Sequence, residues 1–214
     1  MRLADAIQHP KWQEAMNEEL MVIEKNNTWQ LTDLPKGHKT IDVKWVYKIK
    51  VKANGEIDRY KARLVAKGFE QRESYDYEEI FSPVAQIEIV RLIIALAAQR
   101  QWKIHQMGVK SAFLNDPLDK EVYVKQPSGF IQSGKEEKVY RLTKALYGLK
   151  QTPRAWKKRI NSYLYATGFK KCASDHGLYV KTNDYRDLLI LCLYVDDVIF
   201  TRSNLKMIGD SSIS

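Results

Sequence analysis

Two strongly apolar segments flank an acidic turn near the end of the 214-residue sequence, and this feature restricts the fold more than any other. Residues 188–194 and 198–201 are apolar enough for buried strands, and Asp196 and Asp197 lie between them. Two adjacent carboxylates beside buried strands are costly without a compensating cation. Oxygen ligands at a hairpin turn suit Mg²⁺, so the pattern predicts a strand hairpin that carries a magnesium site. A solvent-facing turn without a ligand is the alternative.

A second hairpin is predicted earlier in the chain, and it is strongly basic. Apolar residues and lysines alternate over 43–52, Asn54 and Gly55 form a typical two-residue turn, and a return strand is expected over 57–66. Residues 44–72 contain nine Lys or Arg against three Asp or Glu, a net charge of +6. The lysines share one face of the predicted strand. This clustering favours a phosphate-binding surface, and a solvated strand face is the alternative.

Helices and strands are mixed along the chain. The other predicted elements are helices over 10–25, 86–99 and 153–167, and short strands over 102–109, 121–125 and 177–181. The mixture indicates an α+β fold. A second basic region, residues 135–159, contains nine Lys or Arg against two Glu, a net charge of +7.

Charge and cysteine content narrow the class of protein. The chain has 35 Lys and Arg against 26 Asp and Glu, which gives a net charge of +9 and suits a polyanionic partner such as nucleic acid. Cys172 and Cys192 show no metal-ligand spacing and are expected to be reduced thiols. The first residues lack the apolar core of a signal peptide, and no apolar run is long enough to cross a bilayer. We therefore expect an intracellular protein without membrane contact.

Several short motifs, in a fixed order, carry a resemblance to a known family. They are TWQL (28–31) with LPKG (34–37), KWVYKIK (44–50), RYKARLVAKGF (59–69), VKSAFLN (109–115), KALYGLKQ (144–151) with PRAW (153–156), and YVDD (194–197). Such a set is highly specific and extends over roughly residues 10–205. By these motifs the chain resembles the reverse transcriptase of copia-type long-terminal-repeat retrotransposons.

The resemblance implies a right-hand polymerase over residues 1–205, with an antiparallel palm sheet flanked by helices and a basic fingers region at 43–85. It implies template-directed nucleotidyl transfer by two Mg²⁺ ions, with a deoxynucleoside triphosphate and an RNA or DNA template–primer as partners. Asp196 and Asp197 would be the catalytic carboxylates, and both would bind metal together with the backbone carbonyl of Val109.

The resemblance also implies roles for residues around the substrates. Phe113 would lie under the sugar as a gate against a 2′-hydroxyl. The nucleotide-binding residues would be Lys48, Lys50, Lys61, Arg63, Phe113 and Gln151. The template–primer residues would be Gly148, Lys150, Pro153, Arg154 and Tyr194.

Two positions depart from the family's pattern. The family has an Asp at the position of Gly108, so one of the two carboxylates that must bridge the metals is missing, and Asp116 stands where the family usually has Gly. The chain also ends soon after Asp197, before the rest of the palm, the thumb and the ribonuclease H domain that the resemblance implies. Residues 206–214 are expected to be a disordered tail.

These departures predict a catalytically inactive family member, with the remainder of a Pol polyprotein absent. An enzyme fragment that becomes active when another chain completes it is one alternative. The other is a remnant that at most binds nucleic acid through its basic fingers. A metal phosphatase of another class is excluded because neither His-rich ligands nor further carboxylates accompany Asp196.

Overall fold

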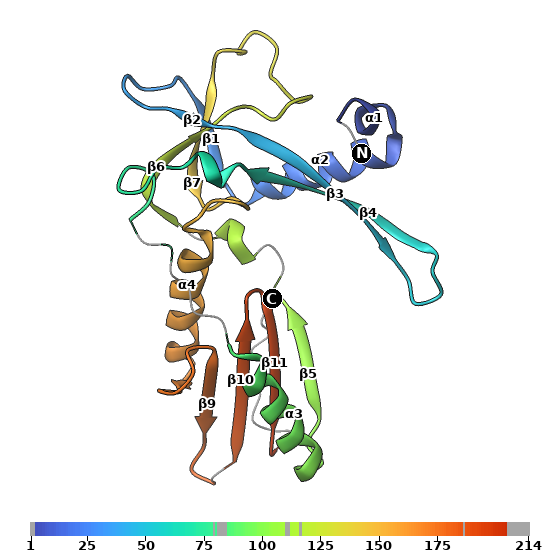
Figure 1. Ribbon diagram of the computed structural model, residues 1–214, viewed down its shortest axis with the longest axis vertical. Helices are drawn as coiled ribbons and strands as arrows, with labels where there is room; N and C mark the ends of the chain where they lie inside the picture. The colour runs from blue at the N-terminus through green and yellow to red at the C-terminus, as the bar shows by residue number, and fades with distance from the viewer. Residues whose placement is uncertain are drawn as a thin grey trace. The chain divides into compact units, whose positions relative to one another are not determined.

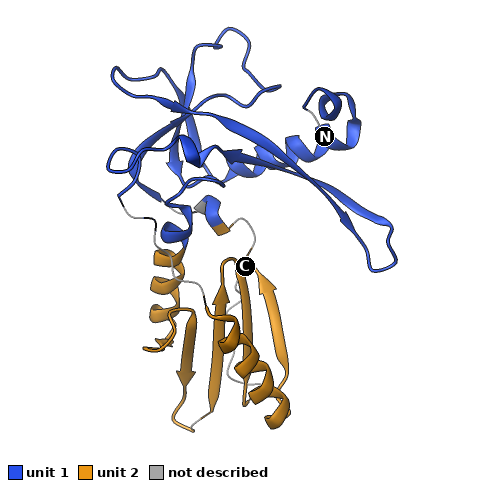
Figure 2. Ribbon diagram, in the orientation of Figure 1, with its two compact units in different colours: residues 1–80, 113–156 blue, residues 81–112, 157–214 orange. Residues whose placement is uncertain are grey.

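The computed structural model describes residues 3–78, 80, 85–109, 112–115, 117–185 and 187–204. Of the residues discussed above, Lys110, Ser111, Asp116 and the predicted tail over 206–214 lie outside this part. The chain divides into two compact units, which Figure 2 shows in blue and orange. Unit 1 consists of residues 1–80 and 113–156, and unit 2 of residues 81–112 and 157–214.

Unit 1 contains two sheets together with helices α1 and α2 and the short helix η1. Its elements are α1 (Leu3–Gln8), α2 (Pro10–Lys25), β1 (Trp29–Thr32), β2 (Thr40–Ile41), β3 (Val43–Val51), β4 (Ile57–Ala66), η1 (Gly68–Glu70), β6 (Pro117–Val124) and β7 (Val139–Lys144). One sheet has the strand order β1-β7-β6-β2, and β3 and β4 form a separate antiparallel pair. Ile23, Leu64 and Leu142 contribute to the core of this unit, which joins α2, the hairpin and the four-stranded sheet.

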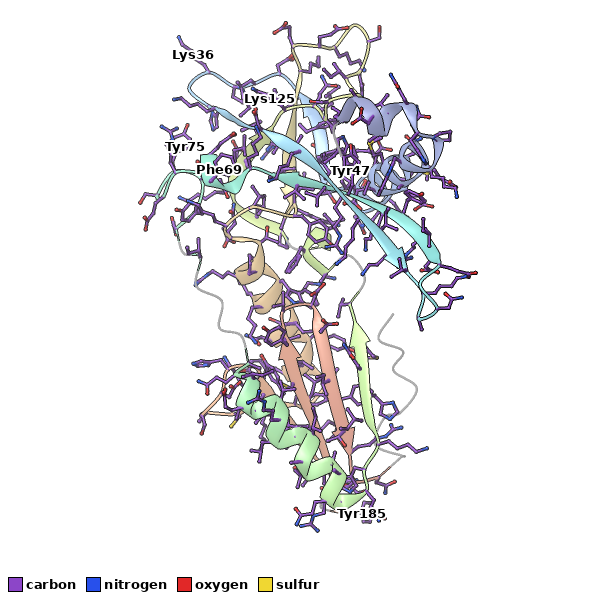
Figure 3. All side chains as sticks on the ribbon, turned by 45° about the vertical axis from the view of Figure 1, so that its right-hand side comes forward. Lys36, Tyr47, Phe69, Tyr75, Lys125 and Tyr185 are labelled. Carbon is purple, nitrogen blue, oxygen red and sulfur yellow. The ribbon has the colours of Figure 1, made fainter. Side chains whose placement is uncertain are left out.

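The β3–β4 hairpin confirms the predicted basic hairpin, and it extends away from the rest of unit 1 (Figure 1). Its turn differs from the predicted two-residue turn: the Lys52 N–H donates to the Glu56 carbonyl oxygen, so residues 53–55 form a three-residue loop. Near its base the predicted alternation holds: Tyr47, which is labelled in Figure 3, packs edge-on against Trp12 of α2, with ring centroids 5.1 Å apart. Toward the turn the alternation fails, because Ile49, Val51 and Ile57 are also exposed. Two strands alone have no layer to cover their apolar face once they pass the end of α2.

Strand β6 departs from the alternation predicted over 121–125. Val122, Tyr123 and Val124 are all buried. This strand lies between β7 and β2, and β2 pairs with it at Tyr123 and Val124. His38 covers Tyr123 on one face, with ring centroids 5.1 Å apart, whereas Val122 and Val124 belong to the hydrophobic core. Burial on both faces removes the two-residue period that a one-sided sheet would show.

Unit 2 is an antiparallel sheet covered by helix α3 (Ile87–Arg100). Its strands are β5 (Ile104–Gly108), β8 (Lys170–Lys171), β9 (Leu178–Thr182), β10 (Leu188–Tyr194) and β11 (Asp197–Arg202), in the order β5-β11-β10-β9-β8. Val90 and Ile93 of α3 pack against Ile190 and Cys192 of β10. Figure 1 shows α3 lying across the strands, and this packing explains the apolar period of the helix.

The chain passes from one unit to the other within α4 (Thr152–Ala166) and within η2 (Ala112–Asn115). The helices predicted over 10–25, 86–99 and 153–167 are found within one residue of those bounds, so the predicted mixture of helices and strands is confirmed. Cys172 and Cys192 are both free thiols, as predicted. Within the described residues, no helix is both long and apolar enough to cross a membrane.

Candidate catalytic site

The acidic turn joins β10 to β11 through a two-residue loop. Tyr194 pairs with Asp197 at the ends of the strands, so Val195 and Asp196 form the loop itself. Val195 has a φ of 58°, whereas Asp196 does not have a positive φ, a combination typical of a type II′ turn. Glycine is preferred at the first loop position of such a turn, and a β-branched residue there is strained by roughly 1–3 kcal/mol. The surrounding strands hold this turn in a conformation that valine alone would avoid.

Gly108 lies directly across from Asp197. Strand β5 pairs with β11 in a register that places Gly108 opposite Asp197, and the Val109 N–H donates a hydrogen bond to the Asp196 carbonyl oxygen at 3.0 Å. A Cβ atom added at Gly108 would have a single neighbour within 4 Å among the described residues, the Asp197 Oδ1 at 3.5 Å. That distance is ordinary van der Waals contact, so a side chain at position 108 would fit beside the Asp197 carboxylate.

The acidic turn brings two carboxylates together. Asp196 is half-buried and Asp197 is exposed, so both carboxylates are available to a ligand. Within the described part of the chain, no group of three or more His, Cys, Asp or Glu side chains is placed to hold a metal ion. The predicted ligands Asp196, Asp197 and Val109 do lie together here, and the position that would add a third carboxylate holds Gly108.

The predicted nucleotide-binding cations lie on the β3–β4 hairpin of unit 1. Lys48 and Lys50 are exposed on β3, and Lys61 of β4 pairs directly with Lys48. Burial lowers the pKa of Lys61, and the neighbouring Arg63 and Arg59 lower it further. The surface is therefore strongly positive and crowded with like charges, which favours the approach of an anion.

Arg63 and Phe113 both contact the ring of Tyr147 in unit 1. The Arg63 guanidinium lies 4.3 Å from the centre of the Tyr147 ring, and the Phe113 ring meets Tyr147 edge-on with centroids 5.5 Å apart. Two predicted nucleotide-binding residues are thus connected by an aromatic ring that sequence reasoning did not single out. Tyr147 lies inside the KALYGLKQ motif, and that was the only sequence signal for it.

Gln151 and Lys150 belong to a polar network with residues 71–77. Gln71 is buried; its side-chain oxygen accepts from the Lys150 N–H at 2.7 Å, and its Nε2 donates to Gln151 Oε1 at 2.9 Å. Gln151 Nε2 in turn donates to the Asp76 carbonyl oxygen, and Lys150 Nζ donates to the Tyr77 hydroxyl at 3.1 Å. The Gln151 amide is therefore engaged on both sides. Gln71, like Tyr147, was missed by sequence reasoning.

Gly148 fixes the position of this segment against β4. Its φ is 92°, and an added Cβ would lie 2.2 Å from the Ala66 carbonyl oxygen. The Ala66 N–H also donates to the Tyr147 carbonyl oxygen at 2.7 Å. Only glycine combines this conformation with so close an approach. Gly148 therefore has a structural reason to be glycine, whatever it contacts in a complex.

The remaining predicted template–primer residues lie at two other places. Pro153 and Arg154 are exposed in the first turn of α4, where proline fits because the first helical N–H groups need no partner within the helix. Tyr194 is exposed at the end of β10, next to the acidic turn. Each of the three is accessible within its own unit.

Comparison with known proteins assigns the family. Residues 26–213 match the model of the family described as reverse transcriptase (RNA-dependent DNA polymerase). The chain belongs to this family. Among its relatives, the Retrovirus-related Pol polyprotein from transposon TNT 1-94 of Nicotiana tabacum is 41% identical over 219 residues, which is 99% of this chain and 16% of the relative.

Two further relatives support the same assignment. The Retrovirus-related Pol polyprotein from transposon RE1 of Arabidopsis thaliana is 41% identical, covering 92% of this chain and 13% of the relative. The Truncated transposon Ty1-A Gag-Pol polyprotein of Saccharomyces cerevisiae is 30% identical, covering 94% of this chain and 16% of the relative. The copia-type reverse transcriptase resemblance is thereby confirmed. The chain spans between 13% and 16% of the length of these three proteins.

Proposed function

We propose that this chain is a reverse transcriptase domain of a retrotransposon Pol polyprotein, built for template-directed nucleotidyl transfer, whose metal site has been disabled by Gly108. In this proposal the β3–β4 hairpin of unit 1 is the fingers and the sheet of unit 2 is the palm. The observation that carries the proposal is the pairing of Gly108 with Asp197, with room at position 108 for a side chain beside the carboxylate.

Asp196, Asp197 and the Val109 carbonyl would hold Mg²⁺. Two bound ions would supply charge neutralisation for the triphosphate and activation of the primer hydroxyl. The residues present fit this role only in part. Two carboxylates at one turn would have to balance the positive charge of the ions, whereas a carboxylate at position 108 would make three. We therefore propose that metal binding is weak and that the chain as it stands does not extend primers.

The other proposed roles follow the positions of the side chains. Lys48, Lys50, Lys61 and Arg63 would contact the triphosphate, and Phe113 would face the sugar. We propose Gln151 as a further nucleotide-binding residue, although its amide is engaged with Gln71 and residue 76. Gly148, Lys150, Pro153, Arg154 and Tyr194 would contact the template–primer.

A metal-binding series tests the proposal at position 108. Calorimetry with Mn²⁺ is compared for the unchanged chain, Gly108→Asp and Gly108→Asn, which adds a similar volume without charge. Gln106→Asp is the matched control, because Gln106 is exposed on the same face of β5 but pairs with Ile199 instead of Asp197. Of the three variants, we expect only Gly108→Asp to bind Mn²⁺ more tightly than the unchanged chain, by about tenfold or more.

The same four proteins are compared in a primer-extension assay with Mg²⁺ and with Mn²⁺. We expect no extension by the unchanged chain. Robust template-dependent synthesis by that chain would overturn the proposed inactivity. Equal Mn²⁺ affinity for Gly108→Asp and Gln106→Asp would overturn the placement of the metal site.

A second candidate function, nucleic-acid binding without catalysis, is favoured by a specific observation. The cations of the β3–β4 hairpin are exposed and need no metal to attract a phosphate backbone. Loss of the metal site would leave this surface intact. Binding of a primer–template by both the unchanged chain and Gly108→Asp, with no extension by either, would support this function.

A further inference from the structure

Helix α2 carries an acidic residue on the face that it buries. Trp12, Met16 and Ile23 are buried on this face, and position 19 lies three residues after Met16 and four before Ile23. Helical periodicity therefore turns Glu19, which is half-buried, toward the same side as the apolar residues. Its neighbour Glu18 is exposed. A carboxylate in such a position requires a hydrogen-bonding or charged partner.

That partner is strand β4. The Leu64 N–H donates a hydrogen bond to Glu19 Oε1 at 3.3 Å. Strand β3 occupies one edge of β4, and in Figure 1 α2 runs beside the base of the hairpin. Glu19 thus satisfies a backbone donor on β4 that the two-stranded ladder leaves open.

The residues next to Leu64 on the other face of β4 are cations. Ala62 and Leu64 are buried, whereas Lys61 and Arg63 alternate with them and are half-buried. Arg63 is also held against the Tyr147 ring. The charged groups around Lys61 are Arg59 and Arg63 on its own strand, Lys48 and Lys50 on β3, and Glu19 on α2.

Glu19 and these cations influence one another. Burial raises the pKa of Glu19, whereas the hydrogen bond from Leu64 and the charges of Arg63 and Lys61 lower it. In the opposite direction, burial and the neighbouring cations lower the pKa of Lys61, and Glu19 raises it. Among the described residues, Glu19 is the one acid that acts on the pKa of Lys61.

We propose that Glu19 is a positioning residue for the phosphate-facing side of β4: it holds the strand through Leu64 and provides the counter-charge that lets Lys61 and Arg63 stand side by side as cations. The inference rests on the proposed function in one respect, namely that a triphosphate is the ligand of these cations. Helix α2 precedes residues 26–213, which match the family model, so the match itself assigns Glu19 no role.

The test measures the ionisation of Lys61 in the full chain. Glu19→Gln keeps an oxygen that accepts the Leu64 N–H and removes the charge, and Glu18→Gln removes an exposed charge from the adjacent position. Trace acetylation followed by peptide mass spectrometry at increasing pH gives the titration midpoint of each lysine. We expect the Lys61 midpoint to fall by about half a pH unit in Glu19→Gln and to stay unchanged in Glu18→Gln.

A second measurement connects this ionisation to ligand binding. Calorimetry with inorganic triphosphate at fixed ionic strength gives the pH at which half of the binding is lost, and we expect this pH to fall together with the Lys61 midpoint in Glu19→Gln. If Glu19→Gln fails to fold, Lys61→Met provides the reciprocal test: the carboxyl carbon of Glu19, followed by nuclear magnetic resonance, should then titrate at higher pH.

The outcomes separate the inference from the proposed function. An unchanged Lys61 midpoint in Glu19→Gln, or an unchanged Glu19 titration in Lys61→Met, would overturn the role of Glu19 while leaving triphosphate binding intact. If the Lys61 midpoint falls in Glu19→Gln but the unchanged chain binds no triphosphate, the electrostatic influence of Glu19 on Lys61 stands, and both the proposed ligand and the positioning role toward it are overturned.

Discussion

Lys157 is a buried cation in unit 2, with 8% of its surface exposed, and its Nζ donates no hydrogen bond within the described residues. The Nζ lies 5.4 Å from the centre of the Tyr179 ring. Burial and the charge of Lys171 lower the pKa of Lys157 from 10.5 to about 8, although Asp175 and Cys192 act in the opposite direction. A lowered lysine pKa means that the folded state disfavours the charged form, so this residue costs stability at neutral pH.

Replacing Lys157 with methionine should therefore stabilise the chain. We expect Lys157→Met to raise the free energy of unfolding at pH 7 by about 1–3 kcal/mol, measured by urea denaturation. The gain should shrink as the pH rises from about 8 to 10.5, because the native lysine loses its charge over that range. The free energy of unfolding of Lys157→Met is compared with that of the unchanged chain at each pH. This comparison is needed because burial also raises the pKa of Cys192 to about 11, and Cys192 is present in both proteins.

Lys158→Met is the matched control, because Lys158 is exposed on the adjacent position of α4. Its effect on stability should be small and independent of pH over the same range. A destabilising effect of Lys157→Met would show that the Lys157 ammonium is better solvated than its burial indicates.

At the scale of single elements, the hairpin of β10 and β11 carries strain at its turn. Val195 has a φ of 58° at the first loop position. The strands on either side are well packed, since Leu191, Leu193 and Val198 are buried. Their packing stabilises the hairpin enough to impose the turn that presents Asp196 and Asp197. Strain concentrated at an acidic turn is typical of a functional site.

Val195→Gly should relieve this strain. We expect the free energy of unfolding to rise by about 0.5–1 kcal/mol, because glycine adopts a positive φ without steric cost. Val51→Gly is the control: Val51 is exposed in β3 with an extended backbone, and glycine there should lower stability by a similar amount. If both variants lower stability equally, Val195 is not strained in solution.

At the scale of the whole molecule, the charge is distributed unevenly. The net charge is +9, and the segment 44–72, which includes most of the β3–β4 hairpin, alone has nine Lys or Arg against three acids. Concentrating the surplus on one hairpin gives it a stronger local potential than the average charge would indicate. Such a surface should bind a phosphate backbone with a steep dependence on salt.

A salt series on primer–template binding measures this surface. We expect the log of the affinity to fall linearly with the log of salt concentration. The slope should become shallower by about 0.9 for each lysine–phosphate ion pair that Lys48→Gln or Lys50→Gln removes. Lys103→Gln and Lys170→Gln, both exposed in unit 2, remove the same charge and serve as controls. Equal changes of the salt slope in the hairpin variants and in the unit 2 variants would mean that the net charge of the chain, and not the hairpin, governs binding.

Local patterns were sufficient for much of this fold. Asn54, Gly55 and the alternation before them specified the β3–β4 hairpin, although its loop has three residues where two were predicted. Helical periodicity placed α2 and α3 within one residue of their observed ends. The apolar segments around Asp196 and Asp197 specified the β10–β11 hairpin. These features depend on residues close together in the chain, so sequence spacing is enough to reveal them.

Other features depend on residues that are far apart in the chain, and only the tertiary structure decided them. The sequence alone showed that Gly108 lacks a carboxylate, and the motifs gave it a place in the family pattern; the register of β5 against β11 decided that it faces Asp197. The stack of Arg63 on Tyr147 and the bond from Leu64 to Glu19 each join distant segments. Residue types and spacing thus determined the local elements and the missing charge at position 108. Strand pairing and packing determined which side chains meet, because contacts between distant segments leave no periodic signal in the sequence.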